Sequence, residues 1–295
     1  MSNLSTTSGE VFYERICQFI STYVKSNNVL GNIEKADLPE FIAIWQSYKL
    51  MIKWIVHLFM HLESSVIRLN ELLTLTSVAL VNFQQSVYST FHSNLTALCL
   101  SLILKEREGE LIDVSLLQES LQIYLMMGLA SMIDTAFATE KREKLKNIDA
   151  ALRVYEYTSF YLRDYEGAIL QSTRDFYQHK SSEWLGSMDV PSYINRVREA
   201  LQQEEARCAQ YLSSGTKPKL VRVVLVECVV AHSDHIFDAA RDMLWAMYDN
   251  SQSEDTFEFP AEKTSLVQSL YRLCCQSQAL EPGQTAYQLA TRMRS

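Results

Sequence analysis

The residues with the strongest capacity for chemistry are a cysteine and two histidines in one apolar stretch. Cys228, His232 and His235 follow one another at intervals of four and three residues, with Asp238 close behind. On a helix these intervals place the side chains on one face, where a thiolate, two imidazoles and a carboxylate could hold zinc. Zinc sites, however, recur with spacings such as Cys-x-x-Cys, and the six cysteines include no such pair. The sequence therefore predicts no metal site, and packing is the simpler role for these residues.

Other candidate groups for catalysis are equally isolated. His57 and His61 are one helical turn apart, but no third ligand accompanies them. Glu204 and Glu205 lie beside Arg207 in a charged stretch that is typical of a solvated helix face. The sequence has no glycine-rich phosphate loop, no Gly-x-Ser-x-Gly and no His-Glu-x-x-His. We therefore expect no catalytic residues, no cofactor and no enzymatic activity.

The composition favours an all-α protein. Apolar residues make up 47% of the 295 positions, whereas glycine and proline number only 8 and 5. No stretch sustains the alternating pattern of a strand. The formal charge is −8, and the densest basic run, residues 140–146, carries its own glutamates. Since a nucleic-acid-binding protein needs a basic patch that neutralises phosphates, we expect no nucleic acid partner.

The cysteines and the first residues bear on location. The cysteines fall within apolar helical patterns, and the first ten residues lack the pattern of a secretory signal peptide. A reducing compartment, the cytoplasm or the nucleus or both, is the resulting expectation. The most apolar run, residues 50–62, contains Lys53 and two histidines and is too short to span a bilayer. We therefore expect no membrane partner.

Apolar residues recur at helical intervals through most of the chain, and polar stretches separate the segments. The predicted helices cover residues 10–26, 38–66, 69–90, 93–106, 114–127, 148–178, 191–212, 220–248 and 264–276, with a short one after 284. Asp37 and Asp113 are predicted as N-caps, and Gly109 as the left-handed residue that ends a helix. Many helices with short loops and no sheet predict an α-solenoid or stacked bundles.

The helix that follows Asp37 is apolar on both sides. Its inner stripe, at steps of three and four, consists of Trp45, Tyr48, Ile52, Ile55, Phe59, Leu62 and Val66. The opposite side carries Leu50, Trp54, His57 and His61, with Lys53 at the edge. A helix at a protein surface is polar on that side. Either this helix is central in a bundle, or its outer side contacts a partner.

Two long motifs carry a family resemblance. Residues 100–129, an apolar helix followed by "KEREGELID" and a Leu-Leu helix that closes on glycine, resemble a pattern of the cullins. The matching positions are Glu106, Arg107, Gly109, Glu110, Ile112, Asp113, Leu116, Leu117 and Gly128. Residues 165–220 resemble a second cullin motif, with Gly215 in place of the usual serine. The matching positions are Tyr165, Glu166, Thr173, Phe176, Tyr177, Tyr193, Leu201, Glu204, Glu205, Arg207, Tyr211, Leu212 and Thr216.

The resemblance implies an elongated stack of five-helix cullin repeats, of which the first is incomplete. The implied parts are a disordered tail over residues 1–10, a partial first repeat over 11–147, a second repeat over 148–263 and the start of a third over 264–295. Against the family pattern, the first two helices of the first repeat are missing. The C-terminal region that holds the RING subunit and the modified lysine is missing too, and an insert follows Gly128.

The resemblance also implies a function. Cullins are non-catalytic scaffolds of ubiquitin ligases. In them the fifth helix of the first repeat, with the second helix, docks a Skp-type or BTB-type adaptor that carries a substrate receptor, and the scaffold spaces it from the catalytic module. The stretch "WQSYKLM", residues 45–51, resembles the opening of that fifth helix. The implied adaptor-binding residues are Leu50, Lys53, Trp54, His57 and His61. Aromatic and aliphatic anchors ringed by polar groups are typical of interface hot spots, but the same residues could instead pack under the insert or against neighbouring helices.

A different class of protein stays open as the alternative. Subunits of membrane-trafficking tethers also consist of long acidic, leucine-rich helices and need no ubiquitin partner. Generic helical patterning does not explain why two specific motifs occur in the order found in cullins, so the ligase scaffold is the favoured prediction.

Overall fold

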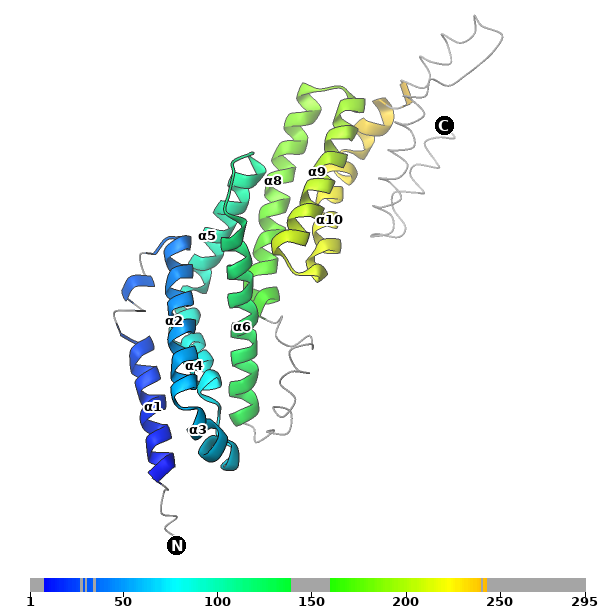
Figure 1. The fold of residues 1–295 in the computed structure, drawn as a ribbon. Coiled ribbons are helices and arrows are strands. Elements are labelled where there is room, and N and C mark those ends of the chain that lie inside the picture. The colour runs from blue at the N-terminus through cyan, green and yellow to red at the C-terminus, as the bar shows by residue number, and fades with distance from the viewer. Residues whose placement is uncertain are drawn as a thin grey trace, which may run out of the picture. The chain divides into compact units, whose positions relative to one another are not determined.

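The computed structural model describes residues 8–26, 29, 31–33, 36–138, 160–239 and 241–242 (Figure 1). These residues form helices and turns and contain no strand, which confirms the predicted all-α fold class. The chain divides into two compact units, residues 1–168 and 169–295. The predicted repeat boundary at 147, the third repeat over 264–295 and the first seven residues of the predicted tail lie outside the described residues; the first helix begins at Ser8.

Unit 1 contains most of the described helices. Its α-helices are α1 (Ser8–Val24), α2 (Leu38–Leu58), the short α3 (Met60–Leu62), α4 (Leu75–Phe83), α5 (Ser89–Arg107) and α6 (Val114–Ala138). Three π-helical segments accompany them: η2 (Glu63–Ile67), η3 (Gln84–Tyr88) and η6 (Tyr161–Glu166). Unit 2 contains most of α8 (Gly167–Ser187), all of α9 (Val190–Tyr211) and α10 (Lys217–Leu225), the 3₁₀ turn η7 (Ser214–Thr216) and the π-helical η8 (Val226–Val230).

Helix α2 begins at a capping box. The Asp37 carboxylate accepts a hydrogen bond from the Glu40 backbone N–H at 2.9 Å, and Glu40 Oε2 accepts one from the Asp37 N–H at 3.3 Å. Pro39 stands in the first turn, where a missing N–H costs nothing. Two otherwise unpaired donors are satisfied, so the predicted cap at Asp37 is confirmed.

The C-terminal end of α2 differs from the predicted one. The predicted helix ran without interruption to Val66, whereas α2 ends at Leu58 and the helix over residues 60–67 is bent from it by 66°. The break lies at Phe59, whose backbone leaves the helical region with φ −106° and ψ 26°. Its ring packs edge-to-face on Phe12 of α1, with centroids 5.4 Å apart. A contact with a distant helix therefore accompanies the bend, and local sequence does not encode such a contact.

The inner stripe of α2 forms the core of unit 1. Trp45, Tyr48, Ile52 and Ile55 are buried, as predicted. The Phe83 ring of α4 lies 4.7 Å from Trp45 and 5.2 Å from Tyr48, between ring centroids. The Tyr48 hydroxyl donates to the Ala79 carbonyl at 2.9 Å. Helices α2 and α4 are thus joined by aromatic packing and a buried hydrogen bond.

Helices α4 and α5 form one continuous helical run over residues 75–107, so the predicted break between Thr90 and Ser93 is wrong. The run begins at Thr74, whose hydroxyl accepts from the Ser77 N–H at 3.1 Å. Polar side chains near the predicted break bond within the helix instead. Ser89 donates to the Gln85 carbonyl at 2.6 Å, and His92 Nδ1 lies 3.2 Å from the Tyr88 carbonyl.

Within the described residues, two apolar stretches, residues 75–107 and 114–134, are long and apolar enough to cross a bilayer, by length and composition alone. The bent pair over residues 38–58 and 60–67 would be a third if it counts as one span. In the most apolar windows of the first two stretches, 33% and 50% of the residues are buried within the protein. Helices α4 and α6, which belong to these stretches, pack against each other. The expectation that the chain has no membrane partner stays a prediction.

The turn between α5 and α6 has the geometry that its glycine predicts. Gly109 has φ +94°, a conformation that side chains with a Cβ rarely adopt. The Gly109 N–H donates to the Glu106 carbonyl and the Glu110 N–H to the Lys105 carbonyl, both at 3.0 Å. These two bonds constitute a Schellman motif that satisfies the last carbonyls of α5. Asp113 accepts from the Ser115 N–H at 3.0 Å just before α6.

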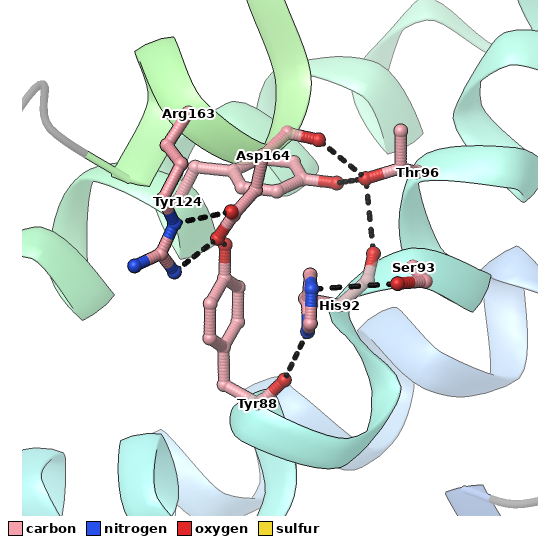
Figure 2. A network of polar contacts seen from close by, with 7 residues as sticks. All are labelled: Tyr88, His92, Ser93, Thr96, Tyr124, Arg163 and Asp164. Atoms are coloured by element: carbon pink, nitrogen blue, oxygen red, sulfur yellow. Dashed lines mark hydrogen bonds and ion pairs between the residues drawn. The ribbon is translucent and has the colours of Figure 1, made fainter. Parts of the chain in front are cut away.

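A polar network links η6 to η3, α5 and α6 within unit 1 (Figure 2). The Tyr88 hydroxyl donates to Asp164 Oδ2 at 2.7 Å, and Arg163 donates to both carboxylate oxygens at 2.6 and 2.8 Å. Thr96 Oγ1 lies 2.7 Å from the Tyr124 hydroxyl and 3.1 Å from the Asp164 carbonyl. Tyr88 and Asp164 belong to two different π-helical segments, which this network joins.

In unit 2, helices α8, α9 and α10 enclose a second core. Its buried members include Tyr177, Tyr193, Val197, Val224 and Cys228. The Tyr193 hydroxyl donates to the Cys228 carbonyl at 2.6 Å. The predicted helix over 220–248 is wrong in part, because α10 gives way to η8 and then to a turn at residues 231–232. Residues 243–248 of that prediction lie outside the described residues.

Candidate protein-docking surface

The outer side of α2 is exposed where the sequence predicts an adaptor-binding face. Leu50 and Trp54 retain 55% and 58% of their accessible surface, and Lys53 and His57 are exposed as well. These exposures exclude burial of the four side chains against the described neighbouring helices. The rings of Trp54 and His57 lie nearly perpendicular to each other, in a T-shaped arrangement with centroids 6.2 Å apart.

His61 is exposed too, but it does not share the axis of α2. It lies on α3, beyond the 66° bend at Phe59. The structure therefore brings four of the five predicted residues together on one helix and places the fifth on the next.

Some exposed apolar residues were missed by the sequence analysis. Leu58 continues the row of Leu50 and Trp54 at intervals of four residues and is 70% exposed. We define the α2 row as these three side chains, which lie one above another on one face of the helix. Met60 is exposed just beyond the bend. The four-residue spacing from Leu50 to Trp54 to Leu58 is visible in the sequence, but the sequence analysis did not assign Leu58 to the exposed side.

Helix α1 exposes two of its aromatic residues. Phe12, Ile16, Phe19 and Ile20 recur at helical intervals in the sequence. In the structure Ile16, Ile20 and Val24 are buried, whereas Phe12 and Phe19 are 45% and 55% exposed. The buried residues follow a narrower stripe, at steps of four, and α1 packs chiefly against α4.

Charge at the α2 row is basic, although the whole chain carries −8. Lys53, His57 and His61 recur every four residues beside the row. Lys49, one turn before Lys53, pairs with Glu119 of α6 at 3.1 Å. Within the described part of the chain, Lys53 has no carboxylate partner of this kind.

The pattern of Cys228, His232 and His235 does not form a metal site in the structure, and Cys228 packs in the core of unit 2. The described residues contain no group of three or more histidine, cysteine, aspartate or glutamate side chains that could hold a metal ion. Burial raises the pKa of the Cys228 thiol to about 12, with the charge of Glu227 adding to the effect. His232 Nε2 lies 2.9 Å from the hydroxyl of Ser181, which is fully buried. A serine without solvent access cannot meet a substrate, so this serine–histidine pair is structural.

The acidic pair of α9 differs from its prediction. Glu204 is only 1% exposed, and its Oε1 accepts from the Tyr177 hydroxyl at 3.0 Å and from Arg207 at 2.8 Å. Glu205 is exposed, as predicted, and pairs with Lys217 at 3.3 Å. The prediction that Glu204 is solvated is wrong because Glu204 lies on the buried stripe of α9, one turn from buried Ala200 and Cys208.

Comparisons with known proteins agree with the two sequence motifs. The family model of the Cullin alpha solenoid domain matches residues 2–289. Putative cullin-like protein 2 of Arabidopsis thaliana is 30% identical over 223 residues, which cover 74% of this chain and 53% of that protein. Cullin-2 of Arabidopsis thaliana is 26% identical over 218 residues, which cover 74% of this chain and 26% of that protein. Cullin-3 of Dictyostelium discoideum is 25% identical over 251 residues, which cover 84% of this chain and 29% of that protein.

The chain thus spans about half the length of the first relative and less than a third of the other two. The family match, in contrast, covers nearly the whole chain and coincides with the all-α fold and with both motifs that flank Gly109 and Tyr177. This chain belongs to the cullin family.

Proposed function

We propose that the chain is a non-catalytic scaffold of a ubiquitin ligase and that the outer side of α2 docks a Skp-type or BTB-type adaptor. The observation that carries the proposal is the α2 row, Leu50, Trp54 and Leu58, which stays exposed on a helix whose other side is buried. Large exposed apolar side chains in a row are typical of a protein interface. Membership in the cullin family supports the choice of partner.

The rigidity of α2 supports the same proposal. Its inner side is fixed by Trp45 and Tyr48 against Phe83, and its start by the capping box at Asp37. A partner therefore meets a helix that is already ordered, which lowers the entropic cost of binding. A tryptophan at the centre of such a contact contributes about 2 kcal/mol or more when it is buried by the partner.

The test is co-purification of the tagged full-length chain with adaptors. We expect the wild-type chain to recover a Skp-type or a BTB-type adaptor, and Leu50→Asp with Trp54→Asp to recover neither while helicity, by circular dichroism, is unchanged. The matched control is Leu111→Asp, since Leu111 is fully exposed in the turn between α5 and α6. Recovery of tethering subunits without any adaptor would instead favour the alternative class.

The proposed location follows from the same function. A ligase scaffold acts on cytoplasmic or nuclear proteins, and the absence of a disulfide among the described cysteines is compatible with a reducing compartment. Fluorescence imaging of the tagged chain tests this, and retention in the secretory pathway would contradict it.

A further inference from the structure

We propose that the docking surface extends from α2 onto α1, where Phe12 and Phe19 form a second aromatic row, and that its occupant is an amphipathic helix with acidic flanks. This inference rests on the proposed docking at α2, but it adds residues, a helix and a class of ligand that docking at α2 alone does not require. The extended surface consists of the α2 row together with the α1 row, Phe12 and Phe19.

Two ring contacts join α1 to α2 and to Phe59, the residue that follows α2. Phe12 packs on Phe59 at one end, with ring centroids 5.4 Å apart. Tyr23 stacks on Tyr48 further along, with centroids 6.5 Å apart. The two helices therefore run antiparallel and side by side (Figure 1), and Phe19 lies between the two ring contacts, two turns from Phe12.

Helix α1 holds its row in place. The Tyr13 hydroxyl donates to the Leu73 carbonyl at 2.8 Å, and Asn70 donates to Glu10 at 2.9 Å. Gly9 lies so close to Val66 that a Cβ there would stand 2.6 Å from a Val66 methyl group. Because α1 is fixed along one side, the 55% exposure of Phe19 belongs to an ordered helix.

Two helices that lie side by side, each with an exposed apolar row, suit a third helix. Side chains spaced by four residues form ridges into which the ridges of another helix pack. An amphipathic helix contributes anchors at intervals of three and four to such a surface.

The charges of the surface define the flanks of that helix. Arg15 of α1 and Lys53 and His57 of α2 are exposed beside the two rows. Within the described residues, neither Arg15 nor Lys53 has a carboxylate partner. Carboxylates on the flanks of the occupant would complement them and raise the rate of association.

Charge also separates the possible occupants. A second copy of this chain in a two-fold contact would place the same basic residues opposite one another. The chain's own residues 249–262 are acidic, with Asp249, Glu254, Asp255, Glu258 and Glu262. Residues 249–256 contain no apolar side chain and so offer no anchors at helical intervals. A separate acidic helix is therefore the occupant that we propose.

The experiment is titration of the full-length chain, and of its variants, with a purified Skp-type adaptor and a purified BTB-type adaptor. We expect Phe19→Asp to weaken binding by roughly tenfold or more, as loss of an aromatic anchor does. Gln18→Asp is the matched control, because it adds the same charge to the exposed side of the same helix. Circular dichroism should show equal helicity for both variants.

The outcomes distinguish this inference from the proposed function. If Leu50→Asp with Trp54→Asp abolishes binding while Phe19→Asp behaves like Gln18→Asp, the α1 row is wrong and docking at α2 stands. If the wild-type chain binds neither adaptor, both proposals fall.

The flanks and the rival occupants have their own readouts. Association should slow as salt is raised, and Lys53→Glu with Arg15→Glu should remove most of that dependence. An association rate that does not change with salt concentration would overturn the proposal that the partner helix has acidic flanks. Self-association in sedimentation that Phe19→Asp abolishes would assign the surface to a second copy. Crosslinks from Lys53 to residues 249–262 in the free chain would assign it to the chain itself, and either result would overturn the proposal.

Discussion

Tyr88 and Asp164 join two π-helical segments that are far apart in the sequence, through a hydrogen bond of 2.7 Å from the tyrosine hydroxyl to the carboxylate. Tyr88 is buried, and its ring lies 5.5 Å from that of Phe160 and 6.0 Å from that of Tyr124. Segment η6 is therefore anchored to η3 by a charge-assisted bond, and to α6 by the Tyr165 ring, which stacks on that of Tyr124 at 4.6 Å.

Tyr88→Phe should lower the free energy of unfolding by about 1.5–3 kcal/mol, because it removes a hydrogen bond to a charged group and keeps the ring. Denaturant titration measures this. The control is Tyr23→Phe, since the Tyr23 hydroxyl makes no hydrogen bond within the described residues. Equal effects of the two substitutions would contradict the role given to the hydroxyl.

Acid should weaken the same anchor. Burial raises the pKa of Asp164, but hydrogen bonds from Arg163 and Tyr88 and the charges of Arg163 and His92 outweigh it, so the net pKa is lowered. The ionised carboxylate therefore stabilises the fold fully above the pKa of an unfolded aspartate, about 4, and this contribution is lost as pH falls from there. Asp164→Asn should flatten the pH dependence of stability below about pH 4. An unchanged slope would show that other carboxylates control it.

Gly9 of α1 lies so close to Val66 of η2 that adding one methyl group at Gly9 should destabilise the fold. Gly9→Ala would bring a Cβ within 2.6 Å of Val66, which forces the two segments apart. We expect a loss of about 1–3 kcal/mol in unfolding free energy, seen as faster hydrogen exchange in α1. Val66→Ala in the same chain should restore much of the protection. If the double variant exchanges as fast as Gly9→Ala, the clash is not the cause.

The buried ion pair of α9 predicts an asymmetry between single and double variants. Arg207→Met removes the ion pair with Glu204 and leaves the buried carboxylate with the hydrogen bond from the Tyr177 hydroxyl. It should lower the free energy of unfolding by about 3–5 kcal/mol. Arg207→Met with Glu204→Gln removes that charge, so it should be more stable than Arg207→Met alone. A double variant that loses the sum of both single effects would contradict this coupling.

The sequence predicted the features that local chemistry determines. Asp37 and Gly109 were assigned correctly because a capping box and a left-handed glycine depend on neighbours a few residues away. The outward position of Leu50 and Trp54 was predicted in the same way, since helical spacing alone opposes them to Trp45 and Tyr48.

Features that depend on distant contacts were not predicted. The bend at Phe59 coincides with a contact to Phe12, which is far away in the sequence. Phe19 has the same type and spacing as a core residue, and only the position of α1 at the edge of unit 1 leaves it exposed. Glu204 lies in a charged stretch, which is typical of an exposed helix face. Hydrogen bonds from the Tyr177 hydroxyl and from Arg207 stabilise its buried carboxylate.

The most direct test of the central claim is the affinity of the purified full-length chain for a Skp-type and a BTB-type adaptor, compared with Leu50→Asp/Trp54→Asp. We predict that one of the adaptors binds the wild-type chain and that the double variant binds it at least about 100-fold more weakly, while Leu111→Asp binds as the wild type does. Equal affinities for the wild-type chain and the double variant would contradict docking at the outer side of α2.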